Sequence, residues 1–132
     1  MEKYIDLNGR EKQITATIKL SDTTFQIKRV VIAVRVLYSN HLIKMGELFK
    51  KVGEIKKDDQ KALKEINISI EEFNKEKEKV YDKILKLLLE KNGYEFNKTW
   101  WNENTDELDI RNFIEECLNK DTNTRSKKKV LK

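Results

Sequence analysis

The chain contains one histidine, His41, and one cysteine, Cys117, which are the residue types most often used as catalytic bases, nucleophiles and metal ligands. One residue of each kind cannot form a His/Cys metal site or an intramolecular disulfide. His41 lies on an apolar helical stripe, and Cys117 lies between Ile114 and Leu118 on another. Both are therefore predicted to be buried, His41 with a hydrogen bond or in an interface. We predict no catalytic, cofactor-binding or metal-binding residue.

Carboxylates and lysines are abundant, but their spacing does not suggest catalysis. Adjacent acids occur at 58–59, 71–72 and 115–116, and adjacent side chains on a helix point in different directions, so they do not form a general acid and base pair. Lys77 interrupts an apolar stripe and is predicted to snorkel or to pair with an acid on a neighbouring helix. The four glycines are scattered singly, without the clustering of a phosphate-binding loop. The sequence predicts a protein that is not an enzyme.

The net charge of this 132-residue chain is concentrated at one end. The chain has 28 Lys or Arg and 23 Asp or Glu, a net charge of +5, and residues 120–132 hold six of the bases and one of the acids. Residues 1–119 are therefore neutral, and we predict one folded domain there and a flexible basic tail over 120–132. A neutral body makes nucleic acid an unexpected partner, although the tail favours an alternative function as a nucleic-acid-binding accessory or regulatory protein.

The sequence has no feature that directs it to a membrane. Its longest near-continuous apolar run, residues 30–37, is interrupted by Arg35 and is far shorter than the roughly 20 residues that span a bilayer. The first residues lack the basic and apolar segments of a signal peptide, and a single cysteine suits a reducing compartment. We therefore expect an intracellular protein without a membrane partner.

The N-terminal segment is predicted to form a β-hairpin at about residues 4–20. Asn8-Gly9 favours a tight turn, and residues 13–20 alternate apolar with polar side chains. A turn or helix cap at residues 21–23 precedes helical spacing that begins at Ile27 and reaches Val52. The β-branched cluster at 30–34 would suit a buried strand equally well if read alone, but the length of the pattern favours a helix. The choice between strand and helix for residues 22–30 stays open.

As a helix, residues 30–37 would be apolar on nearly all sides, which is more than the surface of a monomer requires. This segment is predicted to lie centrally or against another subunit. Its candidate partner-binding residues, in a homo-oligomer or another complex, are Val30, Val34, Leu37 and Tyr38.

Two further helical patterns complete the predicted fold. The first runs from Leu63 to Leu87 and stops at Asn92-Gly93, and a capping box at Ser69 and Glu72 predicts a junction between two helices near Asn67. The second follows Thr105 and Asp106, either of which can cap it. Its apolar face contains Leu108, Ile110, Phe113, Ile114, Cys117 and Leu118. Together these elements predict a compact, mainly α fold of the α+β class with a small N-terminal β-hairpin.

Four aromatic residues follow the Asn92-Gly93 stop within eight positions: Tyr94, Phe96, Trp100 and Trp101. Two consecutive tryptophans cannot easily both point inward, so Trp100 is the predicted core residue and Trp101 the candidate for partner contact. All four aromatics join the candidate partner-binding residues.

This region resembles a known family. The segment Leu87 to Phe96, the Trp100-Trp101 pair, and Asn104-Thr105-Asp106 ahead of a helix at 110–119 are similar to the C-terminal half of tail assembly chaperones of long-tailed bacteriophages and prophages, of the siphovirus and myovirus type. The resemblance implies a non-enzymatic protein that binds the tape-measure protein, with the tail tube protein as a second partner, during tail assembly. It also implies self-association, location in the host cytoplasm, and absence from the mature virion. A structural tail-completion or connector subunit is the alternative within phage biology.

Overall fold

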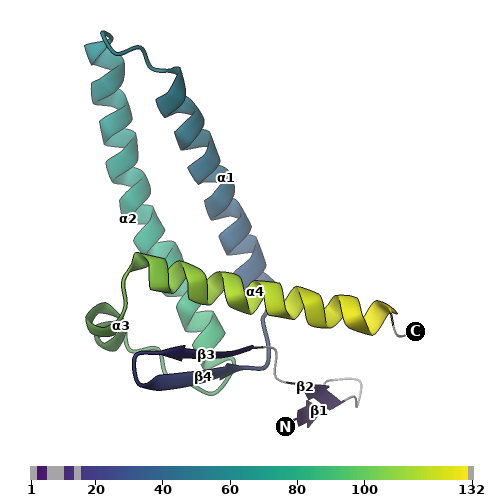
Figure 1. The fold of residues 1–132 in the computed structure, drawn as a ribbon. Helices are drawn as coiled ribbons and strands as arrows, with labels where there is room; N and C mark the ends of the chain where they lie inside the picture. The colour runs from purple at the N-terminus through teal and green to yellow at the C-terminus, as the bar shows by residue number, and fades with distance from the viewer. Residues whose placement is uncertain (1–2, 6–10, 14–15, 131–132) are drawn as a thin grey trace.

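Four helices and two β-hairpins form the described part of the chain in the computed structural model (Figure 1). The structure describes residues 3–5, 11–13 and 16–130, with side chains from Ala16 to Asp121. Helices α1 (Ile32–Glu54) and α2 (Gln60–Glu90) form a long antiparallel helical hairpin. The short α3 (Lys98–Asn104) lies beside the base of the hairpin, and α4 (Glu107–Val130) crosses that base. The mainly helical fold with an N-terminal β-hairpin is confirmed.

The described residues ahead of the helices form two antiparallel β-hairpins where one was predicted. β1 (Lys3–Ile5) pairs with β2 (Glu11–Gln13), and β3 (Ala16–Leu20) pairs with β4 (Thr23–Ile27). The predicted turn at Asn8-Gly9 lies outside the described residues. The predicted strand at 13–20 is divided between β2 and β3, and Ser21, with a φ of 56°, contributes to the tight turn into β4.

Strand β4 decides the choice between strand and helix that the sequence leaves open for residues 22–30. Phe25 lies opposite Ile18 and Ile27 opposite Ala16, and all four side chains are buried on one face. The pairing across the hairpin thus makes residues 23–27 a strand, and α1 begins only at Ile32. Five residues are too few for periodicity to distinguish the two structures, and the deciding hydrogen bonds come from β3.

Helix α2 is continuous over 31 residues, so the predicted junction near Asn67 is wrong. Its N-terminus is capped by Asp59, whose side chain accepts a hydrogen bond from the amide of Ala62 at 3.0 Å. Ser69 instead donates to the carbonyl of Glu65 at 3.2 Å, a bond that leaves the helix intact. The predicted stop is confirmed, because Gly93 has a φ of 87° and the next amide turns back to the helix.

The side chain of Asn92 joins the end of α2 to the connector between β4 and α1. Its Oδ1 accepts hydrogen bonds from the amides of Lys28 and Arg29 at 2.8 and 2.9 Å. Its Nδ2 donates to the carbonyls of Arg29 and Leu88 at 2.8 and 2.6 Å. One side chain thus satisfies three backbone groups of the connector and fixes the direction in which the chain enters α1.

The core lies where β3 and β4, the base of the helical hairpin and α4 meet. An aromatic cluster surrounds Phe25, with ring centroids between 5.2 and 5.8 Å from those of Tyr94, Trp100, Trp101 and Phe113. These four contacts link β4 to segments about 70 or more residues later in the chain. The cluster therefore connects the second β-hairpin to the C-terminal half of the chain.

Helix α4 extends to Val130 and so includes most of the segment predicted to be a flexible tail. Asp106 and Asp109 cap its start reciprocally, each carboxylate accepting from the other's amide, which confirms the predicted cap at Asp106. Leu108 is 59% exposed and therefore does not belong to the predicted apolar face. At the other end Asp121 is buried and accepts from the Arg35 guanidinium at 2.7 Å. The folded body thus reaches Asp121 and stays neutral, and the excess of five bases lies in 122–132.

Candidate protein-binding site

His41 lies inside an aromatic cluster between α1 and α2. Its ring stacks on Phe73 with centroids 5.3 Å apart, and its Nε2 lies 3.4 Å from the hydroxyl of Tyr81. The side chain is buried, as predicted. Burial, followed by the positive charges of Lys77 and Arg111, lowers the pKa of His41, so the neutral ring is the favoured form. It is therefore a packed core histidine.

The lowered pKa of His41 predicts that the fold loses stability in mild acid. The unfolded chain takes up a proton near the ordinary histidine pKa of about 6.5, whereas the folded chain does so only at lower pH, so the free energy of unfolding falls as pH drops below that value. We expect the loss between pH 7.5 and 5.5, measured by urea unfolding, to be smaller in the His41→Phe variant. Equal losses in the two proteins would contradict the assignment.

Cys117 and Lys77, the other residues whose types could do chemistry, also have roles in the packing of the fold. Cys117 is fully buried, and burial raises the pKa of its thiol to about 12, so the reactive thiolate is not formed near neutral pH. Lys77 on α2 pairs with Glu107 on α4, which confirms the predicted pairing with an acid of a neighbouring helix. Each residue holds elements of the fold together.

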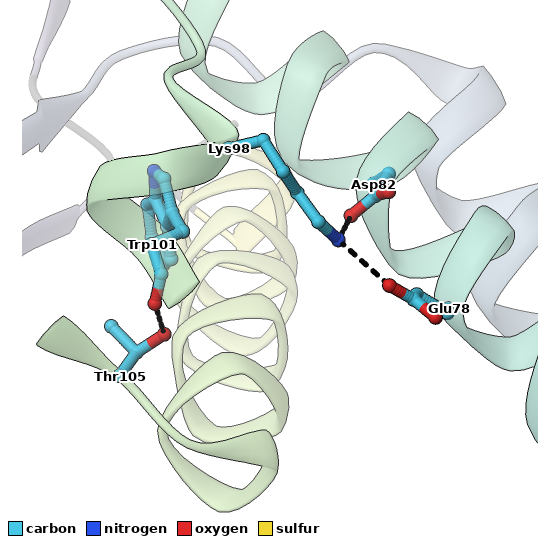
Figure 2. Close-up of polar contacts among 5 residues, drawn as sticks. All are labelled: Glu78, Asp82, Lys98, Trp101 and Thr105. Carbon is cyan, nitrogen blue, oxygen red and sulfur yellow. Dashed lines mark hydrogen bonds and ion pairs between the residues drawn. The ribbon is translucent and has the colours of Figure 1, made fainter. Parts of the chain in front are cut away.

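A cleft of about 310 Å³ opens between α2, α3 and the start of α4. Figure 2 shows Lys98 reaching from α3 to two carboxylates of α2, Asp82 at 2.5 Å and Glu78 at 3.4 Å. Burial lowers the pKa of Lys98, but these carboxylates outweigh it, so the net change is upward. On the other side of α3, Thr105 donates to the carbonyl of Trp101 at 2.6 Å. Lys98 thus fastens α3 to α2, and Lys77, which also lines the cleft, pairs with Glu107.

The eight predicted partner-binding residues lie in or against the core. Four side chains are at most 4% exposed, namely Val30, Val34, Tyr38 and Trp101. The other four are partly buried and pack against that core, namely Leu37, Tyr94, Phe96 and Trp100. The order within the tryptophan pair is the reverse of the prediction, since Trp101 is the buried member, although both rings contact Phe25. These residues stabilise the fold, and a partner would first meet other side chains.

Several exposed apolar side chains lie instead on the half of the helical hairpin that is farther from α4. We call Leu42, Phe49, Val52 and Leu63 the tip surface; they are 39, 65, 44 and 38% exposed. In α1 the first three follow the spacing of one helical stripe, with the partly buried Met45 between them. The spacing of this stripe can be found in the sequence. Val52, however, also fits the predicted apolar spacing that runs from Ile27, so the sequence alone does not show that it is exposed.

A groove of about 580 Å³ lies near the end of the hairpin, and its lining does not include the four residues of the tip surface. Its apolar lining comes from Ile55, Ala62 and Ile66, and its rim carries charges of both signs, including Lys51 and Glu65. An exposed ion pair of Lys44 with Glu76, at 2.9 Å, links the two helices on the way to this end. The end of the hairpin therefore carries two separate features, the exposed apolar side chains of the tip surface and a groove with charges of both signs. Exposed apolar side chains that gather in one region are typical of a surface that binds another protein.

Other kinds of site find no support in the described part of the chain. Within it, no group of His, Cys, Asp and Glu side chains is arranged to hold a metal ion. None of the described helices is long and apolar enough to cross a membrane. Comparisons with protein-family models, curated proteins and solved structures found no match to this chain.

Proposed function

We propose that this chain is a non-enzymatic assembly chaperone of the phage-tail type, which binds helical segments of the tape-measure protein on the tip surface of the α1–α2 hairpin. The observation that carries the proposal is the exposure of Leu42, Phe49, Val52 and Leu63 on one half of a helical hairpin. Large apolar side chains gathered on a projecting element are costly to leave in water and are typical of a surface that another protein covers. The resemblance of residues 87–119 to tail assembly chaperones supplies the identity of the client.

The base of the same hairpin supports a helix as the form of the client. There α4 packs across α1 and α2, with Tyr38 donating to Glu115 at 2.9 Å and Lys77 paired with Glu107. The tip has no such covering helix in the described part of the chain (Figure 1). An amphipathic helix of the client would lay its apolar face on the tip surface, as in other complexes that bind a helix on an apolar surface.

The test uses a purified tape-measure protein of the same phage or prophage. We expect it to stay soluble with the wild-type chain and to be bound at least tenfold more weakly by the Phe49→Asp/Leu63→Asp variant, because a carboxylate in the interface must be desolvated. Ile68→Asp is the matched control, since Ile68 is 57% exposed on α2 but lies outside the tip surface. Equal binding by the double variant and the wild type would contradict the proposal.

The two alternative functions, a nucleic-acid-binding protein and a structural tail subunit, predict different results. A nucleic-acid-binding protein would bind DNA with a steep salt dependence that is lost on removing residues 122–132, where the net charge lies. A structural tail subunit would be present in purified particles. We expect neither result, and either one would replace the chaperone proposal.

A further inference from the structure

A second apolar stripe lies on the other side of α1. Ile32, Val36 and Ile43 are 71, 51 and 59% exposed, and the exposed Ser39 lies between the last two. Each apolar member is two positions from a residue of the buried stripe of α1, which places it about half a turn away around the helix. We call these four residues the outer stripe. It begins at the start of α1 and ends at Ile43, next to Leu42 of the tip surface in the sequence but on a different side of the helix.

The outer stripe lies in a segment with very little charge. Charged residues make up 39% of the chain, so the twelve residues from Ile32 to Ile43 would hold about five at that frequency, yet they hold only Arg35. The Arg35 guanidinium is bound to the Asp121 carboxylate and to the Leu118 carbonyl at 2.7 and 3.1 Å. Depletion of charge together with exposed apolar side chains marks the centre of protein interfaces rather than ordinary surface.

We propose that two copies of this chain associate through the outer stripe, with their α1 helices antiparallel about a two-fold axis between Leu37 and Tyr38. The spacing of the stripe is four, three and four residues, which is the same in both chain directions. An antiparallel second copy therefore sets Ile32 against the other Ile43, and Val36 against the other Ser39. The stripe is complementary to itself, as a two-fold symmetric interface requires.

The charges at the two ends of the stripe favour the antiparallel orientation. Arg29 precedes the stripe and Glu47 follows it, and both are exposed. An antiparallel pair brings each Arg29 near the other copy's Glu47, whereas a parallel pair would bring like charges together. Gly46 has nothing within 4 Å of the position that a Cβ would occupy, so it leaves room there for the arginine of the second copy.

The size of the face sets the expected strength of the dimer. From Ile32 to Glu47 the helical part of this face is about 23 Å long at 1.5 Å per residue, and it is one helix wide. Such a face buries less than the roughly 800 Å² per partner of a standard stable interface. We therefore expect a reversible dimer with a dissociation constant in the micromolar range.

Sedimentation equilibrium of the full chain over a range of concentrations tests the association. We expect the wild type to pass from monomer to dimer, and Ile43→Glu to raise the dissociation constant at least tenfold. Ile68→Glu, at a position of similar exposure on α2, should leave it unchanged. A wild type that stays monomeric up to millimolar concentration, or equal effects of the two substitutions, would overturn the proposal.

Cysteine pairing tests the orientation. Ile32→Cys mixed with Ile43→Cys should form a disulfide between the two variants, because the antiparallel pair sets these positions opposite each other. Ile32→Cys alone should not form one, since its two copies would lie about 16 Å apart along the axis and a disulfide needs Cα atoms within about 7 Å. The native Cys117 is fully buried and does not compete. Ready pairing of Ile32→Cys with itself would overturn the antiparallel arrangement. These results are independent of the proposed function, since none of the substitutions alters the tip surface.

Discussion

Replacing Phe25 by alanine is expected to lower the free energy of unfolding by about 4 kcal/mol. Phe25 is 6% exposed, and the truncation would leave a cavity among four aromatic rings. These rings come from the α2–α3 connector, α3 and α4, so they cannot all close in to fill the space. Urea unfolding monitored by tryptophan fluorescence measures the change, because both tryptophans contact Phe25.

The chain offers a matched control for this substitution. Phe49→Ala removes the same atoms from a side chain that is 65% exposed, and its cost is expected to stay within about 0.5 kcal/mol. Phe25→Leu, at about 1 kcal/mol, keeps the measurement possible if the alanine variant does not fold. Equal costs for Phe25→Ala and Phe49→Ala would contradict the described core.

The second large effect is expected for Asn92→Ala, at about 3 kcal/mol. The substitution removes four hydrogen bonds, three of them to the connector between β4 and α1. The polar groups of Lys28, Arg29 and Leu88 would then have to find water or stay unsatisfied, which costs about 1 kcal/mol or more for each group that remains buried. Urea unfolding gives the size of the loss, and hydrogen exchange at the amides of residues 28 and 29 should show its location.

Asn92→Asp separates the two halves of this hydrogen-bonding pattern. The carboxylate can still accept from the two amides, but its second oxygen would lie against the carbonyls of Arg29 and Leu88, where Nδ2 now donates. It should therefore also destabilise, whereas Asn102→Ala on the exposed side of α3 should have an effect within about 0.5 kcal/mol. An Asn92→Asp variant as stable as the wild type would contradict the donor role of Nδ2.

The helices could be predicted from the sequence because their signals are local. The apolar period of α2, the Asn92-Gly93 stop and the acidic cap of α4 each lie within one or two turns. Strand β4 could not be assigned in this way, since its five residues become a strand through pairing with β3. Asp121 was counted with the tail because its partner, Arg35, is 86 positions away in the chain.

The candidate site was harder to predict for a related reason. Residues 30–38 and the aromatic segment are conspicuous in composition, but the β-hairpin and α4 cover most of them. A helical pattern shows which residues share a face, yet it does not show where a neighbouring element ends. The tip surface exists because α4 crosses only the base of the hairpin (Figure 1). Phe49 and Val52 lie farther along α1 and are left exposed.

A photo-crosslinking amino acid at position 49 tests the central claim most directly. Phe49 is the most exposed member of the tip surface, and an aromatic crosslinker replaces it with little change in shape. With purified tape-measure protein, we expect adducts from position 49 that map to helical segments of the client, and none from the exposed position 86 on α2. Adducts of equal yield from both positions, or none from position 49 while the two proteins still bind, would contradict binding at the tip of the helical hairpin.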